Sequence, residues 1–184
     1  MPRFTRLEEA DMDPRQQEVA ASISAGARGG VRGPFMAWLH SPEMAERLQQ
    51  VGRFARWESS LPARLSELAI LVTAKRWRAR YEWFAHHKMA MEGGLSPAIA
   101  EDVRLGRTPS GMAEDEAAVF HFVQEVQATG DVSDARFEEA KRLFGERGVA
   151  ELLGITGYYT AVSFTLNVDR VPLPDGVPDP FPEG

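Results

Sequence analysis

The sequence of 184 residues contains no cysteine. This absence excludes disulfide bonds, cysteine-based zinc sites and thiol catalysis. Long apolar runs are also missing, because even the longest uninterrupted ones, such as Leu68–Val72, are far too short to cross a membrane. Residues 1–13 lack the apolar segment of a signal peptide. We therefore expect a soluble, cytoplasmic protein.

Positive charge is not in excess. The chain has 21 lysines and arginines against 27 aspartates and glutamates, for a net charge of -6. The arginines are interleaved with acidic residues, so binding to nucleic acid has no electrostatic support. An apolar content of 43% and a charged content of 26% are typical of a soluble globular domain. The length suits one domain over residues 1–184.

No segment alternates as a β-strand does, whereas apolar residues recur at helical spacing along most of the chain. Asp13-Pro14, Ser41-Pro42 and Ser96-Pro97 each combine a capping residue with a proline that suits the first helical turn. We predict an all-α fold of seven or eight helices. Two of these helices lie near the end of the chain, one capped by Ser133 and one over residues 149–166.

Two segments read as irregular. The Gly- and Arg-rich residues 25–34 lack a phosphate-loop pattern and are interpreted as a connector, although such a loop can also cradle an anion. Residues 171–184 contain five prolines and cannot be helical. We expect this tail to lie along the protein surface or against a neighbouring subunit.

The stretch over residues 61–95 organises the chain. Its first helix is apolar on nearly every side yet contains Glu67. A buried carboxylate must be paired, hydrogen-bonded or protonated, because burying it bare is costly. One interpretation is a structural ion pair with Arg64, one helical turn earlier. The other is a functional carboxylate.

The second helix of this stretch carries Glu82 and His86, which are four residues apart and share one face. The carboxylate can orient the imidazole and raise its basicity, or the two can form a simple surface pair. His87 points about 100° away from His86. Di-iron sites in helical bundles use two Glu-x-x-His pairs, and this chain has a single Glu-x-x-x-His, so we predict no metal.

The same stretch resembles the core of the carboxymuconolactone decarboxylase family, in the alkylhydroperoxidase D-like superfamily. The resemblance rests on the segments Arg64–Ala69, Tyr81–Trp83, His86 and Gly94–Ser96. Redox members of the superfamily carry a Glu, a Cys-x-x-Cys pair and a His along two helices. In this chain the two cysteine positions fall on Ala79 and Glu82. The sequence is therefore similar to the cysteine-less, decarboxylase-like branch.

The resemblance implies a cofactor-independent lyase that acts on a small carboxylated lactone or ring-fission product, as in aromatic compound catabolism. It implies Glu67, Glu82 and His86 as catalytic residues. Arg64, Arg80 and Trp83 are the candidates for substrate binding. It also implies a homo-oligomer, as a trimer or hexamer, without a cofactor. The alternative is a non-catalytic, ligand-binding member, whereas thiol peroxidase activity is excluded in its usual form.

Overall fold

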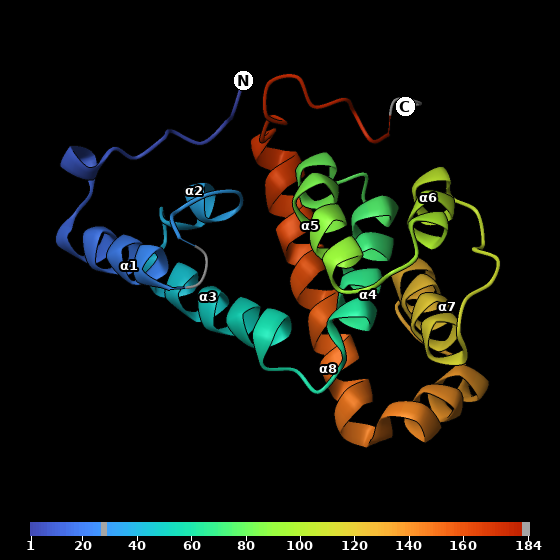
Figure 1. Cartoon of the computed structure of the whole chain (residues 1–184). Coiled ribbons are helices and arrows are strands. Elements are labelled where there is room, and N and C mark those ends of the chain that lie inside the picture. Colours follow the sequence, from blue (N-terminus) through green and yellow to red (C-terminus); the bar gives the residue numbers. More distant parts are fainter. Residues whose placement is uncertain (27–28, 182–184) are drawn as a thin grey trace.

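A computed structural model describes residues 1–26 and 29–181, and this part of the chain is helical without strands (Figure 1). The all-α prediction is confirmed. After a short 3₁₀ turn at Glu9–Asp11, the helices are α1 (Pro14–Ala25), α2 (Phe35–Trp38), α3 (Pro42–Trp57), α4 (Ala63–Arg76), α5 (Arg80–Glu92), α6 (Pro97–Leu105), α7 (Glu114–Thr129) and α8 (Asp134–Asp169). Among the described residues, no helix is long and apolar enough to cross a membrane.

Helix α4 forms the centre of the fold. Every residue from Leu65 to Ala74 is buried, as the apolar sequence predicts. The helix packs against α5, α7 and α8 at once, so it has no free face for water (Figure 1). Each fully buried leucine or isoleucine of this segment contributes about 1.5–3 kcal/mol to folding. A polar side chain within this segment therefore needs partners inside the protein.

Helix α8 runs along the middle of the molecule and ends near the base of the C-terminal tail (Figure 1). The sequence predicts two helices here, and the structure shows a single element with a break at Gly145, where φ is 66° and ψ is 173°. The chain turns sharply at this position. A glycine suits the turn, because a positive φ is strained for other residues. The two predicted helices are thus the two arms of α8, joined without a loop.

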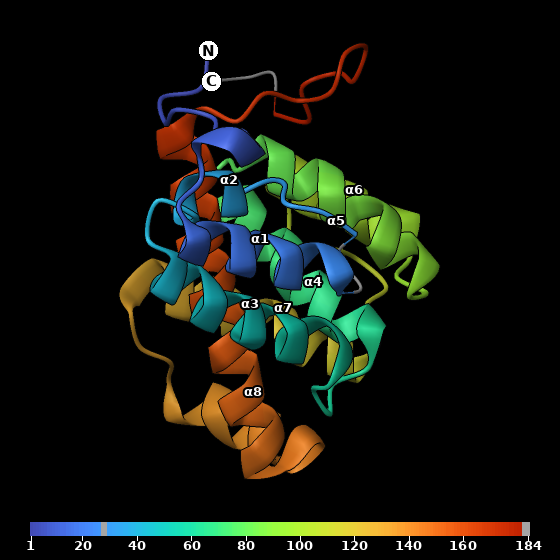
Figure 2. The same cartoon turned by 90° about the vertical axis from the view of Figure 1, so that its left-hand side faces the viewer.

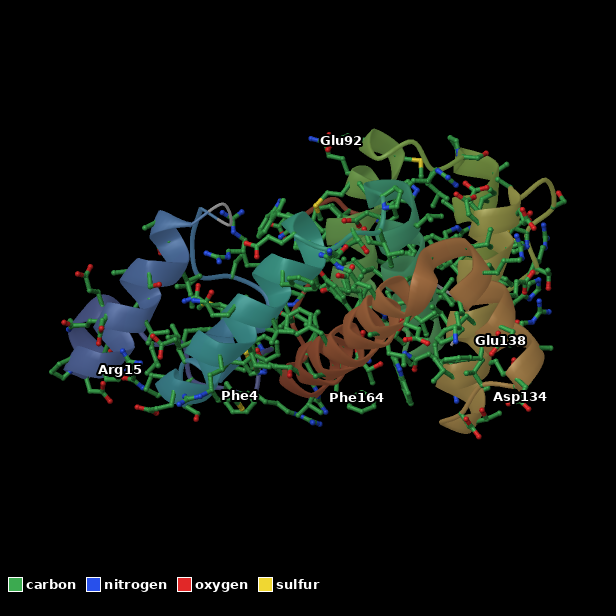
Figure 3. All side chains as sticks on the ribbon, turned by 90° about the horizontal axis from the view of Figure 1, so that it is seen from below. Phe4, Arg15, Glu92, Asp134, Glu138 and Phe164 are labelled. Carbon is green, nitrogen blue, oxygen red and sulfur yellow. The ribbon has the colours of Figure 1, made fainter. Side chains whose placement is uncertain are left out.

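Helices α1, α2 and α3 form an arm beside α8, on the side away from α6 and α7 (Figures 1 and 2). Helix α1 packs along α3, and Asp13 directly before it forms the expected cap with Gln16. In Figure 3, Arg15 of this arm lies at one end of the molecule, and Asp134 and Glu138 lie at the other. The space between the arm and α5 is where the cavity described below forms.

The C-terminal tail packs on its own chain, along α5 and α6. Phe181 is buried, and its ring lies 5.3 Å from the ring of Trp83. Arg78 donates a hydrogen bond to the Phe181 carbonyl and Arg104 donates one to the Pro180 carbonyl. Up to residue 181 the tail is irregular, as its prolines predict, and the predicted remainder at 182–184 lies outside the described residues.

Candidate functional site

The fold-back between α4 and α5 brings Glu67 next to His86. The turn is tight: the Ala79 amide donates to the Ala74 carbonyl at 2.8 Å, and Arg78 takes a left-handed backbone conformation with φ at 50°. The two helices then run side by side. Nδ1 of His86 lies 2.7 Å from Oε2 of Glu67, and its Nε2 lies 2.9 Å from Oε1 of Glu82. The imidazole is thus held between two carboxylates, one from each helix.

This cluster is almost completely buried, with side-chain exposures of 5–8%. Burial alone lowers the pKa of the His86 imidazole, but the charges of Glu82 and Glu67, with their hydrogen bonds, outweigh that effect and raise the pKa to about 9. At neutral pH the ring is therefore an imidazolium. Both of its N–H groups then donate, one to each carboxylate.

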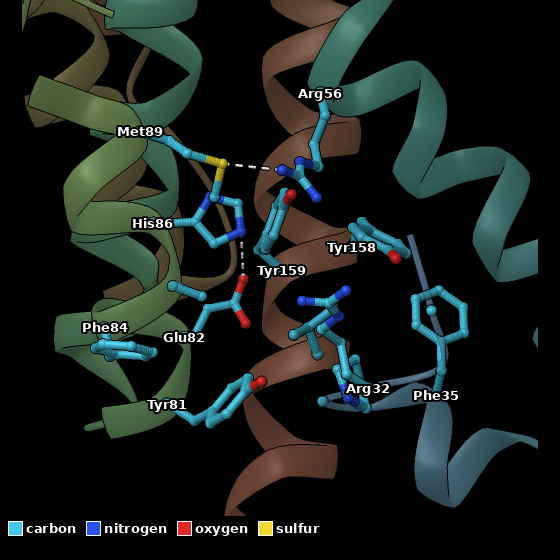
Figure 4. A pocket seen from close by; sticks show the side chains of 15 residues that line it. Arg32, Phe35, Arg56, Tyr81, Glu82, Phe84, His86, Met89, Tyr158 and Tyr159 are labelled. Atoms are coloured by element: carbon cyan, nitrogen blue, oxygen red, sulfur yellow. Dashed lines mark hydrogen bonds and ion pairs between the residues drawn. The ribbon is translucent and has the colours of Figure 1, made fainter. Parts of the chain in front are cut away.

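A cavity of about 310 Å³ lies against this cluster, between α5, α8 and the arm (Figure 4). Glu82 and His86 form part of its wall, while Glu67 lies behind His86 and outside the lining. The other lining residues come from the loop before α2 together with the first residue of α2, from α3, and from the facing sides of α5 and α8. They are Gly30, Arg32, Gly33, Pro34, Phe35, Arg56, Tyr81, Phe84, Ala85, Met89, Tyr158, Tyr159 and Val162.

Two arginines reach this cavity from the arm, and the sequence did not identify either as a site residue. Arg56 of α3 donates to the sulfur of Met89 at 2.9 Å, and its guanidinium packs 4.3 Å from the ring of Trp57. Arg32 lies in the Gly- and Arg-rich loop and donates to the Gly29 carbonyl. Figure 4 shows Arg32 facing Glu82 across the cavity. The loop composition was a usable signal for Arg32, because it suggested an anion site.

Tyr159 closes the cavity beside the imidazole. Its ring meets that of His86 edge-on, with centroids 4.9 Å apart. Burial, followed by the charge of Glu82, raises its pKa well above the usual value of 10. The phenol therefore stays protonated at neutral pH. Figure 4 shows its hydroxyl pointing toward Arg56, so that the cavity contains both a neutral donor and a cationic one.

The three predicted substrate-binding residues do not line this cavity. Arg64 forms ion pairs with Asp115 and Glu116 of α7, both at 2.7 Å, and therefore faces away from Glu67. The alternative ion pair between Arg64 and Glu67 is thus wrong. The three substrate-binding candidates were chosen because they lie close to the motif in the sequence. Closeness along a helix does not fix the face on which a side chain lies.

Arg80 and Trp83 are on the tail side of α5. Arg80 pairs with Asp179 at 3.0 Å, and Trp83 packs between Phe181 and His87. His87 thus lies away from the cavity, as its position on the helix predicts. The described residues contain no group of three or more His, Cys, Asp or Glu side chains suited to a metal ion.

Comparisons with known proteins agree with this architecture. Residues 42–125 match the model of the Carboxymuconolactone decarboxylase family. That range includes α4, α5, Arg56 and the whole Glu67–His86–Glu82 cluster, but neither Arg32 nor Tyr159. No curated protein matches the chain.

The fold is similar to a crystal structure titled alkylhydroperoxidase AhpD core, an uncharacterized peroxidase-related protein from Ralstonia eutropha JMP134. The TM-score is 0.75 at 16% identity, covering 95% of this chain and 93% of the other. The family match over residues 42–125 and the shared fold both agree with the resemblance to the carboxymuconolactone decarboxylase family seen in the sequence.

Proposed function

We propose that this protein is a cofactor-independent acid–base enzyme that decarboxylates, or moves a proton on, a small carboxylated lactone or ring-fission product. One observation carries the proposal: a buried imidazolium, clamped between two carboxylates, forms the wall of a cavity that two arginines enter. A surface ion pair needs neither the burial nor the cavity. The family match supports the same class of reaction.

The arginines account for the carboxylate of the substrate. A guanidinium binds a carboxylate through two parallel N–H donors, and burial strengthens such a pair. Arg32 and Arg56 both approach from the arm, opposite the wall formed by Glu82 and His86. A substrate anion bound there places its ring between the arginines and the acid–base cluster. Tyr158 and Phe35 supply apolar walls for that ring.

The reaction needs an acceptor for electrons and a donor of one proton. Loss of carbon dioxide sends the electron pair of the breaking C–C bond through the double bond into the lactone carbonyl, which becomes a dienolate. The Tyr159 hydroxyl is a neutral, buried donor for that developing oxyanion. His86 then delivers one proton from its Nε2, on the side of Glu82, to the carbon of the dienolate. Solvent afterwards returns a proton to the imidazole. Glu67 positions the imidazole ring of His86 and keeps that ring protonated.

The proposal is tested by mixing the purified protein with 4-carboxymuconolactone and related unsaturated carboxylated lactones. We expect release of carbon dioxide and, in D₂O, one deuterium on the carbon that accepts the proton. His86→Ala should lose about 10²- to 10⁴-fold in turnover, the usual worth of a positioned acid or base. His87→Ala is the matched control, because that ring lies outside the cavity. Equal turnover in the two variants would refute the assignment.

A peroxidase-type activity is the competing possibility raised by the structural neighbour. The usual thiol chemistry of that class has no nucleophile here, because the chain has no cysteine and the two positions are Ala79 and Glu82. A non-catalytic ligand-binding role is the other alternative. A motif packed solid would favour that role, but the Glu82 and His86 side chains line an open cavity.

A further inference from the structure

A second cavity, of about 430 Å³, lies where α5 begins and α8 ends. The first residues of the tail, 171–173, complete its wall. Trp77 and Leu166 give it an apolar side. This wall is well anchored, since Trp77 donates to Gln127 at 2.8 Å and accepts a hydrogen bond from Asn167 at its carbonyl. None of these residues takes part in the acid–base cluster.

Three arginines line this cavity: Arg78, Arg80 and Arg170. No aspartate or glutamate is among its described lining residues. Arg80 pairs with Asp179 at 3.0 Å, but its side chain is still 56% exposed, so the pair is open to a competing anion. The cavity therefore combines a cationic rim with an apolar wall.

The backbone supports a role for these side chains. Arg78 and Arg170 are the only non-glycine residues with positive φ in the described chain, at 50° and 55°. At helix C-termini this conformation favours glycine, and α6 and α7 indeed end at Gly106 and Gly130. Helix α8 ends instead at Arg170. Arginine rather than glycine stands in this strained conformation at two points around one cavity, which points to a use for the guanidinium.

The second cavity adjoins the first. Tyr81 lines both, and its ring is in turn packed by the loop of the arm, where a Cβ at Gly33 would lie 3.3 Å from it. Tyr81 therefore contributes to the walls of both cavities.

We propose that this cavity is a second binding site for a small aromatic or unsaturated carboxylate, of the same chemical class as the substrate. Arg80 and Arg170 bind its carboxylate through charge-assisted hydrogen bonds, since Arg78 already donates to the Phe181 carbonyl, and Trp77 and Leu166 contact its ring. The choice of ligand class rests on the proposed function. The existence of the site rests on the geometry of the second cavity alone.

The test is a titration of the full chain with benzoate, followed by amide chemical shifts in solution. Asn167 and Val171 report on the second cavity, and Gly30 and Met89 report on the catalytic one. Uncharged benzamide at the same concentrations controls for contacts of the ring alone. We expect benzoate to shift both sets of amides with separate binding curves, and benzamide to shift the second set far less.

The variants separate the two sites. A double variant with Arg80→Gln and Arg170→Gly should weaken binding at the second set by about tenfold or more and leave the first unchanged. Glycine suits the backbone at position 170, so the fold is kept. Arg170→Lys retains the charge and should retain most of the binding. Arg32→Gln should weaken only the first set.

The outcomes distinguish this site from the proposed function. Shifts confined to the catalytic set refute the second site and leave the proposed function intact. Shifts at the second set that are equal for benzamide, or unchanged in the Arg80→Gln, Arg170→Gly variant, also refute it. Shifts at the second set alone support this site and contradict the proposed substrate class for the catalytic cavity.

Discussion

The stability of this protein should depend on pH through the buried imidazole of His86. Its pKa is about 9 in the folded protein, against an ordinary value of 6.5 for an unfolded chain. A group with a raised pKa in the folded state stabilises that state fully below its unfolded pKa. The contribution is then lost as pH rises from about 6.5 through about 9. The difference between the two pKa values corresponds to about 3 kcal/mol.

The assay compares wild type with His86→Gln by chemical denaturation at pH 6, 7.5 and 9.5. We expect the difference in unfolding free energy between the two to shrink by about 3 kcal/mol from the lowest to the highest pH. Other titrating groups are common to both proteins and largely cancel in that difference. His87→Gln provides the control, and its difference from wild type should stay flat over the same range.

An independent readout is the titration of the His86 ring by NMR. Glu67→Gln removes one of the two charges that hold the proton, so the ring should titrate at a lower pH in that variant. A wild-type ring that titrates at or below 6.5 would refute the buried charge cluster. So would a stability difference between wild type and His86→Gln that does not change with pH.

Three further predictions concern the cavity, the missing thiols and assembly. Tyr159→Phe should lower turnover by about 10²-fold with little change in KM, as loss of one oxyanion donor does, and steady-state kinetics with a carboxylated lactone would check this. No thiol-dependent peroxide reduction is expected in a coupled assay with a dithiol donor, and detectable turnover would contradict the assignment of Ala79 and Glu82 to the cysteine positions. We also expect a homo-oligomer, because Phe164 and Val168 are exposed on α8. A monomer at micromolar concentration in sedimentation would contradict that expectation.

Local pattern was sufficient to predict the acid–base cluster. Glu82 and His86 share a face because they are four residues apart on one helix, and no tertiary information is needed for that. Glu67 was placed in the interior by the apolar residues on either side of it. Its contact with His86 required one more step, the reversal of the chain between α4 and α5, which the polar residues between the two apolar segments indicate.

The other residues of the cavity wall could not be predicted in the same way, because they come from segments that meet only in the folded protein. Arg56 lies on a predominantly polar face of α3, where an arginine looks like any solvated surface group. Arg32 lies in a loop, and no helical period applies there. Tyr159 is buried like its apolar and aromatic neighbours on α8. The residue type alone therefore does not distinguish a side chain in a cavity wall from one in the core.

The absence of Arg64 from the cavity wall follows from the same physics. It is three residues before Glu67, which places it near the carboxylate along the helix, but α7 offers Asp115 and Glu116 on the adjoining side. Two opposite charges at 2.7 Å hold that guanidinium away from α5. The cation facing the cluster must then come from outside the motif, and the arm supplies it through Arg32 and Arg56. Under the proposed function, the motif would supply the proton chemistry and the arm α1–α3 would select the anion that binds beside it.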